Sequence, residues 1–174
     1  MAARPAAALA VAVERPALLF VDSEPAMQSL APALRSAFAL TAHSDVAAAR
    51  EALHRIRPAL VTMDADMMGS AAADFCRAAK ALTCRPTVLV MTETVQNVPG
   101  LLAAGCDEVL LKPYAPQLLY TRIRRLLRSP RSTTGASTCL HCGQKAATRF
   151  EFASHRRAWF ACLACNQVWL AKAL

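Results

Sequence analysis

Residues 16–25 read P-A-L-L-F-V-D-S-E-P, an apolar run that ends in an acid and leads directly into a helix start. An apolar run of this length is typical of a strand that a parallel sheet buries on both faces. Pro25 suits the first turn of the helix that follows Ser23. This stretch therefore predicts a strand–helix unit with Asp22 at the junction.

The same unit recurs along the chain. The pattern predicts further strands at 40–42, 59–63, 87–91 and 109–111. It predicts further helices at 45–56, 70–82 and 115–127, and one more that follows the strand at 87–91 and ends at Gly105. Five strands that alternate with five helices over about 113 residues predict an α/β fold, with an open five-stranded parallel sheet and helices on both faces.

Four polar residues follow four of these strands: Asp22, Asp64, Thr92 and Lys112. In open parallel sheets the ligand site lies beyond the carboxyl ends of the strands, so we expect the four side chains to converge. Any one of them alone is more often a solvated loop residue. Four complementary types at four strand ends favour a chemical site.

Two carboxylates in one crevice raise each other's pKa unless a cation lies between them. Mg²⁺, which prefers oxygen ligands, is the cation that best fits such a pair. A carboxylate held there can attack phosphorus and form an acyl phosphate. The metal and Lys112 would neutralise charge on the phosphoryl group, and Thr92 would donate a hydrogen bond to it.

With these residues in place, residues 16–128 resemble the receiver domain of bacterial two-component response regulators. The resemblance is carried by L-L-F-V-D-S-E-P at 18–25, V-T-M-D-A-D-M-M-G at 61–69, V-L-V-M-T at 88–92 and A-A-G-C-D-E-V-L-L-K-P-Y at 103–114. It implies a doubly wound, flavodoxin-like fold. It also implies a phosphorelay role, with a sensor histidine kinase or a phosphotransfer protein as the phosphoryl donor.

The resemblance assigns a role to each residue of the pocket. Asp64 is then the phosphoacceptor, Asp22 belongs to the acidic Mg²⁺ pocket, Thr92 is the switch hydroxyl and Lys112 is the phosphoryl-binding lysine. The domain is then a phosphorylated signalling switch.

Other positions extend or depart from the receiver pattern. Ser23 stands where receivers carry a second pocket acid, so we expect Mg²⁺ to be needed at high concentration. Asp66, through its backbone or side chain, and Glu24 are further candidates for Mg²⁺ binding. Val109 replaces the usual switch aromatic, and Pro113 allows a cis peptide bond after Lys112.

These departures keep a second function open, that of a pseudo-receiver which binds partners as an adaptor without being phosphorylated. The retained pocket residues favour the phosphorylated switch. We do not expect an enzyme, because the sequence builds no substrate pocket beyond the phosphoryl site.

The end of the chain has a different composition. Residues 129–138 read as a linker, and a C-x2-C-x19-C-x2-C pattern follows at Cys139, Cys142, Cys162 and Cys165. Four thiolates at this spacing suit tetrahedral Zn²⁺, with two disulfides or four free thiols as the alternative. Residues 139–174 resemble a zinc ribbon, with strands expected at 149–152, 158–161 and 168–170, and so small a module needs its metal to fold.

The positive charge also lies at this end. Residues 1–120 carry a net charge of −1 and residues 121–174 a net charge of +9, which together give the +8 of the chain. Arg149, Arg156 and Arg157, interleaved with aromatic residues, form a candidate basic surface. We rank a downstream protein target slightly above nucleic acid, and a homodimer through the last receiver helix stays open.

The beginning of the chain is read as a disordered extension over residues 1–15. Its apolar run, Ala6–Val13, is too short to span a membrane, and no other run reaches the length required. The single cysteines outside the C-x-x-C pairs favour a reducing, cytoplasmic location.

Overall fold

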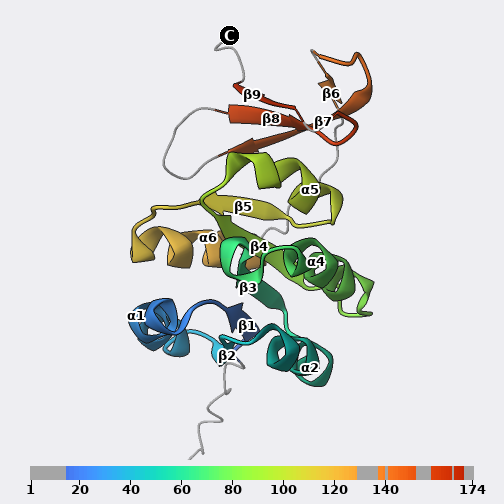
Figure 1. The fold of residues 1–174 in the computed structure, drawn as a ribbon. Coiled ribbons are helices and arrows are strands. Elements are labelled where there is room, and N and C mark those ends of the chain that lie inside the picture. The colour runs from blue at the N-terminus through green and yellow to red at the C-terminus, as the bar shows by residue number, and fades with distance from the viewer. Residues whose placement is uncertain (1–14, 129–136, 140, 152–157, 166, 171–174) are drawn as a thin grey trace, which may run out of the picture.

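The computed structural model describes residues 15–128, 137–139, 141–151, 158–165 and 167–170, which form two β-sheets with helices around the larger one (Figure 1). The predicted extension lies outside these residues apart from Arg15, as does the linker apart from 137–138. None of the described helices combines the length and the apolarity needed to cross a membrane.

The larger sheet has five parallel strands in the order β2-β1-β3-β4-β5. They are β1 (Ala17–Val21), β2 (Ala39–His43), β3 (Leu60–Asp64), β4 (Thr87–Thr92) and β5 (Glu108–Leu111). The helices are α1 (Glu24–Arg35), α2 (Val46–Ile56), α3 (Ala65–Met68), α4 (Ala71–Ala81), the 3₁₀-helix η1 (Val95–Asn97), α5 (Val98–Ala103) and α6 (Pro116–Arg128). The predicted doubly wound α/β fold is confirmed, and its strand order reverses between β1 and β3.

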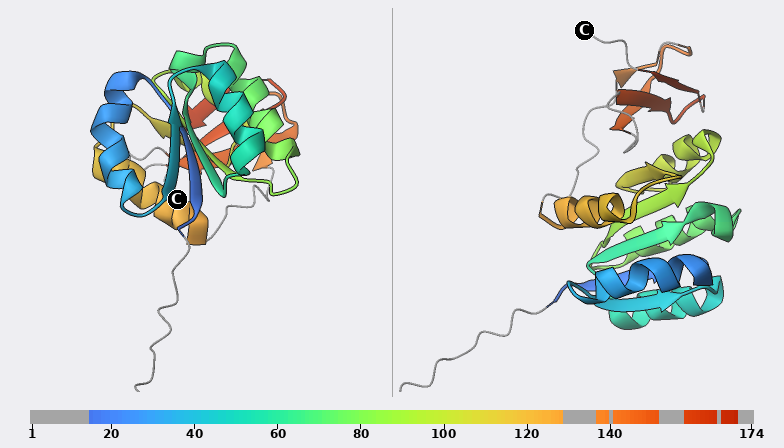
Figure 2. Two further views of the ribbon diagram at one scale, coloured as in Figure 1. Left: turned by 90° about the horizontal axis from the view of Figure 1, so that it is seen from below. Right: turned by 90° about the vertical axis from the view of Figure 1, so that its left-hand side faces the viewer.

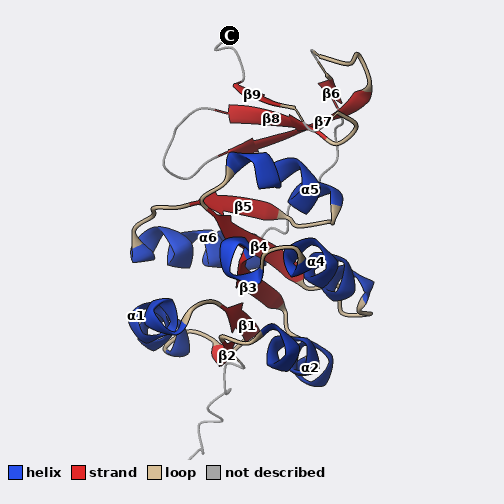
Figure 3. Ribbon diagram, in the orientation of Figure 1, coloured by secondary structure: helices blue, strands red, loops and turns tan. Residues whose placement is uncertain are grey.

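Helices cover both faces of this sheet (Figures 2 and 3). Leu18 and Phe20 of β1 pack with α1 and α6, whereas Leu19 and Val21 pack with α2, α4 and α5. Successive side chains of a strand point to opposite faces, and here both faces are buried. This explains why β1 is apolar at every position instead of alternating.

Two helical segments differ from the prediction. The one-turn helix α3 was not expected, and it starts where the Asp64 side chain accepts a hydrogen bond from the backbone N–H of Asp66 at 2.9 Å. The helix predicted up to Gly105 is split into η1 and the six-residue α5. Gly105 has a φ of +96°, the left-handed backbone that suits the residue after a helix end.

The smaller sheet, which we call the four-cysteine module, has four antiparallel strands in the order β6-β7-β8-β9. They are β6 (Ser137–Thr138), β7 (Lys145–Glu151), β8 (Ala158–Cys162) and β9 (Val168–Leu170). Strands β8 and β9 contain the segments expected at 158–161 and 168–170, whereas β7 begins earlier than the strand expected at 149–152, whose last residue lies outside the described residues. Strand β6 comes from the end of the stretch read as linker.

The four-cysteine module packs against one edge of the larger sheet, where β7 contacts β5 and β8 contacts α5 (Figures 1 and 2). Ala161 of β8 is fully buried in the same core cluster as Val98 and Leu101 of α5. Trp159 and Val168 pack against that cluster from the module. The two sheets therefore share a continuous apolar core.

We expect the substitution Ala161→Asp to separate the four-cysteine module from α5 and β5. It places an unpaired carboxylate in the shared core, at a cost on the order of 3 kcal/mol. Hydrogen–deuterium exchange should then be faster in α5 and β5. The matched control is Leu163→Asp, because Leu163 is 37% exposed. Equal protection of α5 and β5 in both variants would contradict the shared core.

Candidate functional site

The fold brings the four strand-end residues to one rim. Asp22 follows β1, Asp64 ends β3, Thr92 ends β4, and Lys112 follows β5. The first three are buried, with exposed fractions of 2%, 5% and 0%. Because β1, β3, β4 and β5 are parallel neighbours, their carboxyl ends lie along the same side of the sheet.

Asp64 and Lys112 form the central ion pair of this rim. The Lys112 ammonium lies 2.6 Å from Asp64 Oδ2, and the Lys112 backbone N–H donates to the Thr92 carbonyl at 3.0 Å. Burial acts to lower the pKa of Lys112, but the hydrogen bond and charge of Asp64 outweigh it and raise that pKa. The lysine is therefore firmly cationic beside the expected phosphoacceptor.

Asp66 meets three donors. Its Oδ1 accepts from the Thr92 hydroxyl at 2.8 Å, and its Oδ2 accepts from the backbone N–H of Glu93 at 2.8 Å and lies 3.3 Å from Lys112 Nζ. We call the three donors, Thr92 Oγ1, Glu93 N and Lys112 Nζ, the anion cradle. Burial alone would raise the pKa of Asp66, but the bonds from the cradle lower it. The Glu93 donor could not be predicted from the sequence, because a backbone N–H carries no signal in residue type.

Asp22 has a different environment. Burial and the negative charge of Asp64 raise its pKa from 3.8 to about 6, although the backbone N–H of Ser23 donates to its Oδ1 at 2.7 Å. A divalent cation between Asp22 and Asp64 would relieve this destabilised charge, so the two carboxylates fit Mg²⁺.

The other two Mg²⁺ candidates, Glu24 and Asp66 through its backbone or side chain, stay predictions. Glu24 is exposed at the first residue of α1, and the Asp66 carboxylate is bound in the anion cradle. Among the described residues, carboxylates do not gather in a group of three that could hold a metal ion. Asp22 and Asp64 are the buried carboxylates of the rim, and Ser23 adds no charge to them.

The loop after Lys112 completes the rim. The Lys112–Pro113 peptide bond is cis. The Tyr114 hydroxyl lies 2.8 Å from Met91 Sδ, and burial together with the charges of Asp22 and Asp64 raises the pKa of Tyr114. The tyrosine is thus a neutral, partly buried wall on the acidic pocket.

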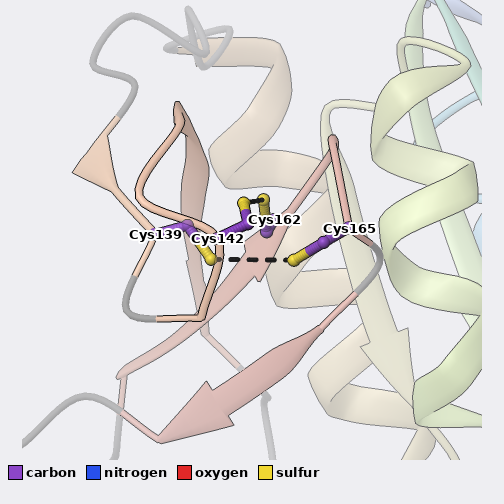
Figure 4. Close-up of side chains that lie close together, drawn as sticks. All are labelled: Cys139, Cys142, Cys162 and Cys165. Atoms are coloured by element: carbon purple, nitrogen blue, oxygen red, sulfur yellow. Dashed lines mark hydrogen bonds between the residues drawn. The ribbon is translucent and has the colours of Figure 1, made fainter.

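The second candidate site is the cysteine cluster of the four-cysteine module (Figure 4). The Sγ atoms of Cys139, Cys142, Cys162 and Cys165 all lie within 4.8 Å of one another. The pairs Cys139–Cys165 and Cys142–Cys162 are each 3.7 Å apart. Zn–S bonds of about 2.3 Å in a tetrahedron place sulfur atoms about 3.8 Å apart, so the cluster fits Zn²⁺.

The backbone around the cysteines favours a thiolate at Cys162, whereas burial and the neighbouring cysteine side chains raise the pKa of Cys165. The backbone N–H of Cys139 donates to the Gln144 carbonyl at 2.8 Å, and that of Cys162 donates to the Gln167 carbonyl at 2.9 Å. Gly143 has a φ of +71° in the first of these two turns. Burial acts to raise the pKa of Cys162, but N–H bonds to its sulfur outweigh it and lower that pKa to about 7.

The basic residues are only partly placed. Arg149 lies in β7, whereas Arg156 and Arg157 lie outside the described residues. In α6, Arg122 and Arg125 pair with the buried Glu108 of β5 at 2.9 and 2.8 Å. Arg122 and Arg125 are thus paired within the chain, whereas Arg124 and Arg128 are exposed, and the Arg124 guanidinium lies 5.8 Å from the centre of the Tyr120 ring.

No protein-family model matches the chain, and no curated protein matches it. Several solved structures do. A response regulator from Thermotoga maritima aligns with a TM-score of 0.59 at 22% identity, over 66% of this chain and 99% of that one. The signal receiver domain of a response regulator from Bermanella marisrubri gives 0.59 at 24% identity, over 66% and 99%. Chemotaxis response regulator CheY4 of Vibrio cholerae gives 0.59 at 19% identity, over 64% and 98%.

The five-stranded sheet and its helices have the receiver fold. The likeness establishes the architecture of this receiver-fold domain. The alignment with the Thermotoga maritima structure covers 66% of this chain, which is close to the share that residues 16–128 make up.

The raised pKa of Asp22 predicts a specific pH dependence of stability. The metal-free folded chain holds this proton more tightly than the unfolded chain, so the stabilisation is fully present below pH about 4 and is lost as pH rises through about 6. We expect Asp22→Asn to remove this slope and to raise the free energy of unfolding above pH 7 by about 1–2 kcal/mol.

Urea unfolding in Mg²⁺-free buffer from pH 4 to about 8 measures the effect. Asp74→Asn is the control, because the Asp74 side chain is 62% exposed and its substitution removes the same formal charge. Parallel stability curves for wild type and Asp22→Asn would show that Asp22 does not carry the slope.

Proposed function

We propose that the chain is a response regulator of a two-component system, in which Asp64 accepts a phosphoryl group in a Mg²⁺-dependent reaction. The observation that carries the proposal is the 2.6 Å contact between Lys112 Nζ and Asp64 Oδ2, at a rim that also holds Asp22 and the Thr92 hydroxyl. A sensor histidine kinase or a phosphotransfer protein is the expected donor.

The rim residues divide the work of this transfer. An Asp64 carboxylate oxygen attacks phosphorus, the bond from phosphorus to the donor breaks, and the donor keeps the electron pair. Bound Mg²⁺ would neutralise charge between Asp22, Asp64 and the phosphoryl oxygens. Lys112 balances the remaining negative charge, and Thr92 donates its hydroxyl hydrogen bond to a phosphoryl oxygen.

Acetyl phosphate with Mg²⁺ should give one phosphoryl adduct on Asp64, because the small donor needs no docking surface. The adduct should require high Mg²⁺ concentrations, since Ser23 contributes no charge to the metal pocket. Intact mass spectrometry should detect it in wild type and in Asp74→Asn, and not in Asp64→Asn. Wild-type protein that stays unmodified at saturating donor and Mg²⁺ would favour the second function below.

The second function is a phosphorylation-independent adaptor. The hydrogen bonds from the anion cradle to Asp66 favour it, because the donors expected to receive a phosphoryl group already hold a carboxylate. In either function we infer a signalling or binding protein and not an enzyme.

We propose that the four-cysteine module holds one structural Zn²⁺ through Cys139, Cys142, Cys162 and Cys165. The sulfur–sulfur distances of 3.7 Å support this ligand set. The module has a small core of its own, in which Cys139, Ala147 and Cys162 are the buried members, so metal bonds would supply much of its stability.

Elemental analysis should find about one zinc per chain in wild type, because four thiolates close one tetrahedral site. Cys142→Ser should lose the metal, and hydrogen exchange should become fast in β7 and β8 and faster in β5 and α5, which the module covers, while β1, β3 and β4 stay protected. Cys84→Ser is the matched control, because Cys84 is an exposed free cysteine outside the cluster. A zinc-free wild-type protein with protected β7 and β8 would exclude a structural zinc.

We place the output of the chain in the four-cysteine module, with a protein target ahead of nucleic acid. The described residues of the module form strands and turns, without a helix that could enter a DNA groove. The unpaired cysteines suit a reducing cytoplasmic setting.

A further inference from the structure

Asp66 fills a site that is built for anions. A hydroxyl, a backbone N–H and an ammonium group converge on its carboxylate, at 2.8, 2.8 and 3.3 Å. We propose that Asp66 is a built-in ligand of the anion cradle, and that it keeps the cradle closed to phosphoryl oxygens until its side chain swings away. This inference rests on the proposed function for the identity of the competing anion, and it adds the way in which access is controlled.

The competition follows from the number of donors. A phosphoryl group on Asp64 presents three terminal oxygens, and the hydroxyl, N–H and ammonium of the cradle are the kinds of group that stabilise them. Lys112 lies 2.6 Å from Asp64 and 3.3 Å from Asp66, so the same ammonium serves both carboxylates. A phosphoryl group and the Asp66 carboxylate are both negative and would need the same donors, so one displaces the other.

The structure also provides a second place for the Asp66 side chain. Asp66 is the second residue of α3, and its side chain is 27% exposed. It borders a cavity of about 600 Å³ that lies between the α3–α4 turn and η1, with Gly69, Ser70, Gln96 and Asn97 in its wall. Rotation of one side chain can therefore move the carboxylate from the cradle towards water without a change in the backbone.

Asp66 is distinct from a metal ligand in this arrangement. A carboxylate that served Mg²⁺ would face Asp22 and Asp64, whereas the Asp66 oxygens are both bonded on the Thr92 side of the rim. Removing a metal ligand would weaken anion binding in Mg²⁺, and removing an internal competitor would strengthen it. The direction of the change therefore decides between the two roles.

The test titrates the full ¹⁵N-labelled chain with inorganic phosphate in excess MgCl₂ and follows the Glu93 amide signal, which reports the cradle directly. We expect Asp66→Asn and Asp66→Ala to bind phosphate at least tenfold more tightly than wild type. Asp74→Asn is the matched control for the loss of one negative charge, because Asp74 is 62% exposed on α4. Equal midpoints in all four proteins, or a Glu93 signal that responds in none of them, would overturn the proposal.

A second measurement on the same proteins separates this inference from the proposed function. Acetyl phosphate should modify Asp66→Asn several-fold faster than wild type, as read by intact mass. Tighter phosphate binding in Asp66→Asn without any adduct would reject phosphorylation and support the internal ligand. Adduct formation at equal rates with equal phosphate affinities would support phosphorylation and reject the internal ligand.

Discussion

The Lys112 ammonium is the charge that allows Asp64 and Asp66 to lie close together at the end of β3. It contacts Asp64 and Asp66 directly, and its backbone N–H is bonded to the last residue of β4. For Asp22 the attraction of Lys112 does not offset burial and the repulsion of Asp64, and the pKa of that carboxyl rises to about 6. The negative charges of Asp64 and Asp66 are thus offset by Lys112, whereas the environment of Asp22 favours a proton or a bound cation.

Much of the fold and part of the site could be predicted from the sequence. The strands were visible because a sheet buried on both faces needs uninterrupted apolar residues, as in Leu18–Val21. The convergence of Asp22, Asp64 and Thr92 followed from the parallel strand order. The direction of the Asp66 carboxylate could not be predicted, because one side-chain torsion decides whether it faces the metal pocket or the anion cradle.

For the four-cysteine module, the cysteine cluster could be predicted from the sequence, but the position of the module against the larger sheet could not. The spacing of its cysteines predicts the cluster, because each C-x-x-C pair is a local turn and two such pairs are a typical ligand set of a structural zinc site. Its place against β5 and α5 depends on complementary surfaces that no local pattern encodes. Strand β5 is an edge strand of the larger sheet, and the module lies against it and against α5, with Trp159, Ala161 and Val168 in contact with the shared core.

The anion cradle and the docked module are connected by one short segment. Thr92, which bonds Asp66, is fully buried at the end of β4, and Val98, which starts α5, is fully buried in the core shared with Ala161. The residues between them form the Glu93 turn and η1, and the backbone N–H of Glu93 is itself a donor of the cradle. Both ends of the segment are therefore fixed by packing: one lies at the cradle, and the other lies in the core that the four-cysteine module shares.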